Sequence, residues 1–271
     1  MTPMQTPGQV WDAMQSAKAG ASAFCTNFFP VESKLRNWIE HSELFAELRH
    51  GATFFFRKDR DFVRLYFCAA DPAALQRETE ACPALKTERV VTDLVGQESM
   101  VNDLLPVLAP AGFRRYTRLQ RLTRMGRPES AADAPPVGFA EPAEGPAVLG
   151  LIESIFDPYG EQLPRLYEIE FAIAHRQVLV ARLDGELAGL IFFETQGQAS
   201  TVRFWAVAEK FRSLKVGSAL MRHYLKIHAP VRRFTLWVNA GNEDAVRKYR
   251  HYGYAPDGLI DQVLASPLIH A

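Results

Sequence analysis

Residues 207–220 read VAEKFRSLKVGSAL, and this segment decides the fold of the second half of the chain. It comes after a β-rich run from Ser200 to Val207 and leads into apolar residues that are spaced for one face of a helix, from about Ser213 to His228. A strand ends here, a turn comes next and a helix begins. The first turn of a helix has unpaired backbone N–H groups and the positive end of the helix dipole, which together suit phosphate oxygens.

Three residues of this segment strengthen the phosphate interpretation. Arg212 and Lys215 add positive charge that favours a di- or triphosphate. Gly217 removes a side chain where the backbone could approach a ligand closely. Many helix starts carry a glycine and a basic residue for structural reasons alone, so the interpretation needs support from residues further along the chain.

A second informative segment, residues 242–254, reads NEDAVRKYRHYGY and comes after a predicted strand from Arg233 to Val238. Asn242 is suited to cap the N-terminus of a short helix, and Gly253 is suited to end it in a left-handed conformation. One face of that helix carries Ala245, Tyr249 and Tyr252.

The second half as a whole alternates strands and helices. Its predicted order is β-α-α-β-β-β-α-β-α-β, with the turn signal Asp184-Gly185 between two of the strands. This order predicts an α/β (α+β) fold in which helices flank a mixed, mainly antiparallel sheet.

Residues 126–136 are rich in proline and small residues and predict a linker between domains 1–125 and 137–271. The first half resembles a reduced copy of the second. It contains, in order, a hairpin (53–68), a helix (72–80), a strand (89–94) and a second helix (98–108). We therefore predict two tandem domains of the same fold.

Composition excludes several classes of protein. Lys plus Arg and Asp plus Glu number 31 each, so the chain lacks the charge excess of a typical nucleic-acid binder. No stretch approaches the roughly 18–20 apolar residues of a membrane helix. Three cysteines form no CxxC pair, and the seven histidines show no metal-binding spacing. We expect a cytoplasmic protein with no metal, no nucleic-acid partner and no membrane segment.

The two segments together resemble the GCN5-related N-acetyltransferase (GNAT) superfamily, whose members use acetyl-CoA. The family's cofactor loop, Arg/Gln-x-x-Gly-x-Gly/Ala, corresponds to Arg212-Ser-Leu-Lys215-Val-Gly217. Its second signature, Asn-x-x-Ala-x-x-x-Tyr-x-x-x-Gly-Phe/Tyr, is matched from Asn242 to Tyr254 without a gap. The resemblance covers about residues 137–271.

The resemblance implies a binding site for acetyl-CoA and a primary amine as acceptor. The pyrophosphate would bind the backbone amides of about Ser213 to Ser218, and the pantetheine arm would run beside the end of the preceding strand. The residues implied in cofactor binding are Ala206, Val207, Arg212, Ser213, Leu214, Lys215, Val216, Gly217, Ser218 and Asn242. The amine would attack the thioester directly.

The resemblance also suggests catalytic residues. Tyr249 would protonate the departing thiolate, because a phenol with a pKa of about 10 is protonated at neutral pH. For the general base we consider Glu194, near the end of a central strand, with Glu168 and Glu170 on a neighbouring helix as alternatives.

Lys215 departs from the family pattern, which has a glycine at this position. A positive φ here would strain the backbone by about 1–3 kcal/mol, whereas a helical φ would let the ammonium reach a phosphate. The first half has no counterpart of the loop, which implies a GNAT-like domain without a cofactor site.

Three functions remain open. The leading one is transfer of an acetyl or short acyl group to a primary amine on a small molecule or peptide. The second is a catalytically inactive acyl-CoA-binding or scaffold protein, and the third is a tandem acetyltransferase for protein lysines. The sequence leaves the acceptor open, and it allows a monomer or a homodimer.

Overall fold

The computed structural model describes residues 1–126, 136–228 and 231–269. The chain forms two compact units, one of Met1–Leu119 with Gly258–Ala271 (unit 1) and one of Gln120–Asp257 (unit 2). Most of the predicted linker, residues 127–135, lies outside the described residues. No helix in the described part of the chain is both long and apolar enough to span a membrane.

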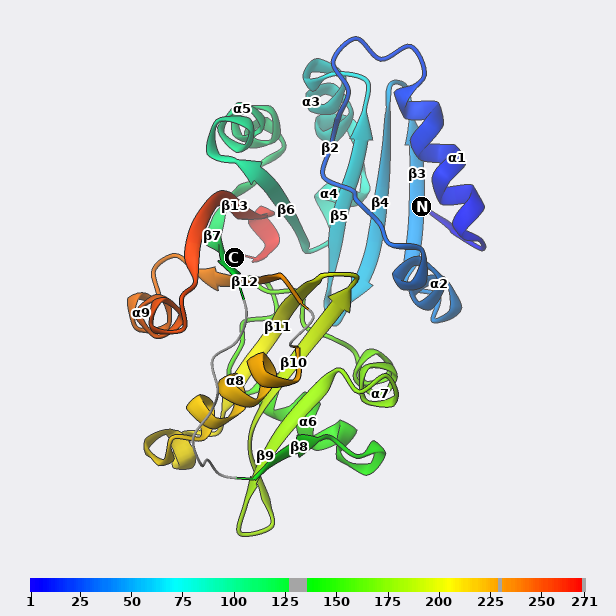
Figure 1. The fold of residues 1–271 in the computed structure, drawn as a ribbon. Coiled ribbons are helices and arrows are strands. Elements are labelled where there is room, and N and C mark those ends of the chain that lie inside the picture. Colours follow the sequence, from blue (N-terminus) through cyan, green and yellow to red (C-terminus); the bar gives the residue numbers. More distant parts are fainter. Residues whose placement is uncertain (127–135, 229–230, 270–271) are drawn as a thin grey trace. The chain divides into compact units, whose positions relative to one another are not determined.

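Unit 2 has the predicted order of elements (Figure 1). These are β8 (Val137–Phe139), α6 (Gly145–Glu153), α7 (Leu166–Ala174), β9 (Val178–Leu183), β10 (Glu186–Gln196), β11 (Ala199–Val207), α8 (Val216–Ile227), β12 (Arg233–Asn239) and α9 (Glu243–His251). The last strand of the order, β13 (Ala255–Ala265), begins in unit 2 and continues in unit 1. Strands of unit 2 pair in the order β12-β11-β10-β9-β8. Strands β11 and β12 pair in parallel, whereas β8 to β11 pair antiparallel.

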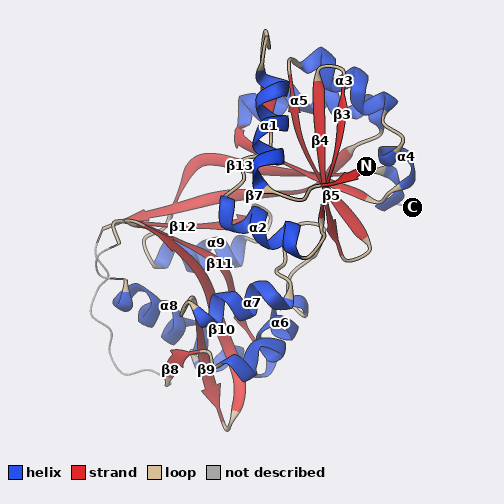
Figure 2. Ribbon diagram, turned by 90° about the vertical axis from the view of Figure 1, so that its right-hand side faces the viewer, coloured by secondary structure: helices blue, strands red, loops and turns tan. Residues whose placement is uncertain are grey.

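Helices cover both faces of this sheet (Figure 2). On one face, α8 and α9 bury Leu220, Tyr224 and Val246 against alternate residues of the strands. On the other face, α6 and α7 bury Ile152 and Ile169. The strands are apolar on both faces because both are covered, which explains their nearly continuous hydrophobic runs.

Strand β11 contains a β-bulge opposite Phe192 and Phe193 of β10. Phe204 lies opposite Phe192 and Val202 lies opposite Phe193, so Arg203 is an extra residue on β11. Bulges bend a strand and increase its twist. Pairing between β11 and β12 ends at the same point, at Val202 opposite Leu236, although both strands continue for several residues. Beyond the bulge, the two strands therefore diverge.

Unit 1 repeats this arrangement, and the predicted tandem fold is confirmed. Its elements are β1 (Thr2–Pro3), α1 (Pro7–Lys18), β2 (Cys25–Thr26), α2 (Glu32–Glu40), β3 (Leu44–Arg49), β4 (Ala52–Asp59), β5 (Phe62–Ala69), α3 (Pro72–Ala81), α4 (Ala84–Thr87), β6 (Val90–Gln97), α5 (Glu98–Leu108) and β7 (Arg114–Met125). The parallel pair is again the one that comes after the hairpin, here β5 and β6. Helices α1 and α2 pack on one face of the sheet, and α3 and α5 pack on the other.

The two halves exchange their last strands, which the sequence did not predict. Residues Leu259–Ala265 of β13 pair with β6 in unit 1. The second part of β7, from Gln120 onward, belongs to unit 2, where Leu122 is fully buried in the core. The units therefore differ from the predicted domains 1–125 and 137–271 at their C-terminal ends.

In unit 1, the chain itself fills the space between the diverging parallel strands. Pairing of β5 with β6 covers only Val63 and Arg64, and β5 then pairs with β2 instead. Asn27, directly after β2, bridges the two strands: its Nδ2 donates to Asp93 O at 3.0 Å, and its Oδ1 accepts from Phe67 N at 2.7 Å. The hydrogen-bonding groups on this edge of β5 thus find partners within unit 1.

Charged side chains also occupy the space between β5 and β6. The Arg64 side chain is fully buried and contacts an Asp93 carboxylate oxygen at 3.2 Å, joining β5 to β6. At the start of α3, the Asp71 carboxylate accepts the N–H of Ala74 at 2.8 Å, and Pro72 has no N–H to offer. A carboxylate therefore occupies the place where a helix N-terminus would otherwise hold an anion.

Candidate functional site

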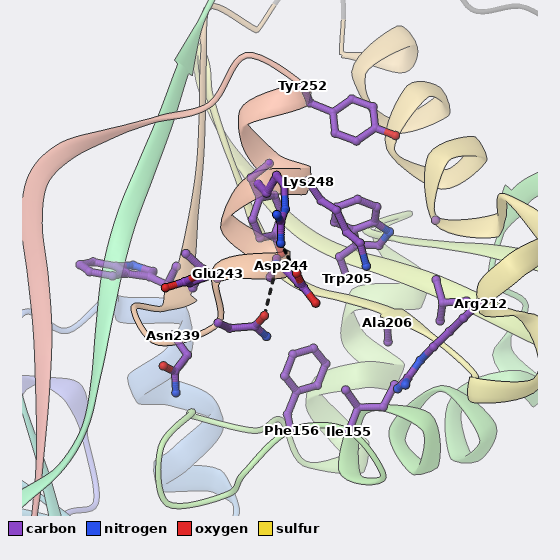
Figure 3. Close-up of a pocket in the computed structure, with 18 of the residues that line it drawn as sticks. Ile155, Phe156, Trp205, Ala206, Arg212, Asn239, Glu243, Asp244, Lys248 and Tyr252 are labelled. Atoms are coloured by element: carbon purple, nitrogen blue, oxygen red, sulfur yellow. Dashed lines mark hydrogen bonds and ion pairs between the residues drawn. The ribbon is translucent and has the colours of Figure 1, made fainter.

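Unit 2 contains a large cavity at the point where β11 and β12 diverge (Figure 3). Its volume is about 1570 Å³, larger than the 300–1,000 Å³ that is common for small-molecule sites. One wall is the end of β11 (Trp205–Val207), and another is the end of β12 (Trp237–Asn239). The starts of α8 and α9 and the loop after α6 complete the lining.

The loop between β11 and α8 differs in detail from the prediction. A 3₁₀ helix covers Glu209–Leu214, and α8 begins at Val216 rather than at about Ser213. The later start has a backbone cause, because Lys215 adopts a left-handed conformation that separates the two helices. The first bond at the start of α8 runs from Ala219 N to Lys215 O at 3.0 Å. The N–H groups of Val216, Gly217 and Ser218 precede it and are available to a ligand.

Lys215 has a φ of 60° and a ψ of 14°. Of the two alternatives for this residue, the strained one is therefore observed, since a lysine adopts the conformation that a glycine adopts at little cost. Lys215 is exposed and is one of the residues that line the cavity at the start of α8.

The predicted cofactor residues separate into two groups. Those that line the cavity are Ala206, Val207, Arg212, Lys215, Gly217, Ser218 and Asn242. The others lie elsewhere: Val216 is fully buried in the core, and Ser213 and Leu214 are exposed. In Figure 3, the Arg212 side chain extends along the cavity toward Ile155.

Gly217 has a packing role in addition to its place in the lining. A Cβ atom there would lie 3.1 Å from Cζ2 of Trp205, so the missing side chain is what lets α8 approach the indole of β11. Trp205 Nε1 is buried and has no hydrogen-bond partner within the described residues.

Asn242 caps α9 as predicted. Its Oδ1 accepts the N–H of Ala245 at 3.0 Å, which leaves its Nδ2 as a donor at the cavity. Acidic residues Glu243 and Asp244 occupy the first turn of α9, where they interact favourably with the helix dipole.

Tyr249 lies on the face of α9 that borders the cavity. Its ring packs against Trp205, with ring centroids 5.4 Å apart, and against Tyr254 at 6.1 Å. Burial raises the pKa of Tyr249, and the negative charge of Glu161 raises it further. The phenol therefore carries its proton throughout the neutral range.

The three candidate bases lie outside the cavity lining. Glu194 accepts from Nη1 of Arg203, the bulge residue, at 2.9 Å. Glu168 accepts the N–H of Arg165 at 2.8 Å and so caps α7. Glu170 is exposed on α7.

Sequence reasoning missed the acidic residues on the loop between α6 and α7. Asp157 and Glu161 line the cavity together with Phe156. Phe156 projects into it between Asn239 and Arg212 (Figure 3). Residues 157–160 read Asp-Pro-Tyr-Gly, which predicts a turn. A turn sequence does not indicate that its residues line a cavity formed by distant parts of the chain. Within the described ranges, no three His, Cys, Asp or Glu side chains gather as a metal site.

Comparison with known proteins identifies the fold. Residues 148–254 match the model of the acetyltransferase (GNAT) family. No curated protein is a significant sequence match.

Several solved structures share the architecture of both units. A GCN5-related N-acetyltransferase from Sphaerobacter thermophilus aligns with a TM-score of 0.59 and 15% identity over 95% of this chain and 90% of that one. A Drosophila protein aligns with a TM-score of 0.60 and 15% identity over 98% of both chains. A tandem GNAT protein from the clavulanic acid biosynthesis pathway gives 0.57 and 13% identity, over 98% of this chain and 97% of that one.

The protein thus has the tandem GNAT fold. Its C-terminal half is a GNAT-family domain, and the resemblance seen in the sequence is confirmed.

The left-handed conformation of Lys215 can be tested by comparing two variants that both remove its charge. Lys215→Gly should be more stable than Lys215→Ala by about 1 kcal/mol, because only glycine relieves the strain at this φ. Urea unfolding of both variants measures the difference. If alanine is instead the more stable residue, as it is at ordinary helical positions, the assigned backbone conformation is wrong.

Proposed function

We propose that unit 2 is an acyl-CoA-dependent N-acyltransferase that transfers an acetyl or short acyl group to a primary amine. The observation that carries the proposal is the divergence of β11 from β12 at the Arg203 bulge. It leaves one edge of β11 unpaired with β12 beyond Val202, and the last three residues of that strand, Trp205–Val207, line the cavity. Such an edge presents N–H and C=O groups to a partner.

The amide groups of a pantetheine arm fit this edge. An extended chain with alternating donors and acceptors can bond to a strand edge as a further strand does. The cavity is large enough for such a ligand, and its lining includes the start of α8 with Arg212 and Lys215. Backbone N–H groups and two cations suit the phosphates of CoA.

The thioester supplies the activated acyl group, and residues of the chain position the substrates and transfer the protons. We assign Tyr249 as the general acid. Its phenol lies at the cavity, and its raised pKa keeps the proton in place until a thiolate forms. Direct attack by the amine requires no covalent intermediate on the enzyme.

Thermal unfolding with and without acetyl-CoA tests the proposed substrate. A ligand at 100 times its Kd stabilises the folded state by about 2.7 kcal/mol. For a domain of this size, the midpoint should rise by roughly 5–10 °C with acetyl-CoA and with CoA. ATP, which has phosphates and adenosine but no pantetheine, should give a much smaller shift.

Two other outcomes have a clear meaning. A shift without turnover of any amine would favour the alternative of a catalytically inactive acyl-CoA-binding protein. No shift at millimolar acetyl-CoA would contradict the proposal and favour a scaffold.

Tyr249→Phe tests the acid. The variant should lower kcat by about 100-fold while leaving acetyl-CoA affinity nearly unchanged, because the hydroxyl acts on the leaving group only. Tyr254→Phe is the matched control: this ring touches Tyr249 but lies in the core, outside the cavity lining, and its kcat should stay within about twofold of wild type. An unchanged kcat in Tyr249→Phe, or an equal loss of binding, would refute the role.

A further inference from the structure

The loop between α6 and α7 places two carboxylates on one wall of the cavity. Asp157 and Glu161 both line it, four residues apart. The Asp157 side chain organises the loop: Oδ1 accepts the N–H of Tyr159 at 3.1 Å, and Oδ2 accepts the N–H of Gly160 at 3.2 Å. The N–H of Glu161 donates to the carbonyl oxygen of Asp157 at 2.9 Å. The position of the Glu161 backbone is therefore fixed.

The two carboxylates differ in their surroundings. Both oxygens of Asp157 accept backbone N–H groups of its own loop, so this carboxylate has a structural role there. Burial raises the pKa of Glu161 to about 7, and the negative charge of Asp157 contributes to this rise. A carboxyl group with a raised pKa that lines a cavity is a common feature of sites of proton transfer.

Two further groups act on Glu161 from other elements. Arg203, the bulge residue of β11, lowers its pKa by positive charge and so limits the rise. Tyr249 of α9 also lines the cavity, and the Glu161 charge in turn raises the pKa of that phenol. Glu161 and Tyr249 are therefore close enough to interact, and both border the cavity.

We propose that Glu161 is the general base, which accepts a proton from the ammonium group of a cationic primary amine. This inference rests on the proposed acyl transfer. It also defines the acceptor: a positively charged amine that binds beside the loop carrying Asp157 and Glu161. Arg203 holds Glu194 in an ion pair away from the cavity lining, so Glu194 helps to fix the bulge residue.

The proton balance is complete with these two residues. Glu161 takes one proton from the ammonium and later releases it to water. The neutral nitrogen forms a C–N bond with the acyl carbon as the C–S bond breaks. Tyr249 gives its proton to the sulfur, and the second proton lost by nitrogen restores the phenol. The products are the amide and the thiol, with one proton released to solvent.

Glu161→Gln tests the role through the pH dependence of transfer. The probes are acetyl-CoA and a panel of simple amines: glycinamide, benzylamine, tyramine and spermidine. Wild-type kcat/KM should rise through about pH 7 as Glu161 ionises. The variant should lose roughly 100-fold near neutral pH, and the loss should shrink as the pH approaches the pKa of the amine itself, where no base is needed.

Two further variants separate catalysis from structure. Glu161→Asp keeps a carboxylate and should retain part of the activity. Glu153→Gln makes the same change at an exposed position of α6, outside the cavity lining, and should behave as wild type. All three variants should give the wild-type thermal shift with acetyl-CoA.

A second readout does not depend on turnover. Infrared difference spectra of the protein between about pH 6 and about pH 8 should contain a carboxyl band that disappears in Glu161→Gln. The absence of such a band, or a Glu161→Gln variant with wild-type rate and pH profile, would overturn the assignment and leave the acyltransferase proposal standing. If the wild-type protein neither binds acetyl-CoA nor acylates any amine, the proposed function itself fails, and the base assignment fails with it.

Discussion

The structure depends on one constraint: the hydrogen-bonding groups along a strand edge must find partners. In each unit, a pair of parallel strands is joined over a few residues and then diverges. In unit 2, the extra residue Arg203 bends β11 at the point where pairing with β12 ends. The ends of both strands, the start of α8 and Tyr249 all line the cavity at this divergence.

The two units differ in what lies against the free edge of the diverging strands. In unit 1, β2 pairs with the free part of β5, Asn27 bridges to β6, and the buried Arg64 and Asp93 close the remaining space. The Asp71 carboxylate occupies the start of α3. In unit 2, the corresponding edge borders a cavity with basic residues at the start of α8. The same fold thus has its strand edge filled by its own chain in unit 1, whereas in unit 2 the edge borders a cavity.

Local sequence patterns predicted much of this. The order of elements in unit 2, the Asn242 cap and the hairpin of unit 1 are confirmed because each depends on neighbouring residues. The bulge at Arg203 escaped prediction because register is set between strands. The exchanged strands and the cavity wall at Glu161 depend on contacts far apart in the chain. The sequence showed that Lys215 departs from the family's glycine. Only the observed φ of 60° distinguishes the strained backbone conformation from the helical one.

We propose that the edge of β11 beyond the bulge binds acetyl-CoA, whereas its counterpart in unit 1 is already paired. Amide hydrogen exchange measured with and without acetyl-CoA tests it most directly. We expect acetyl-CoA to slow exchange in residues 203–207 and to leave residues 67–69 of β5 unchanged, because β2 and the Asn27 side chain already pair with them. Unchanged exchange in residues 203–207 at saturating acetyl-CoA, or equal slowing in both segments, would contradict the account.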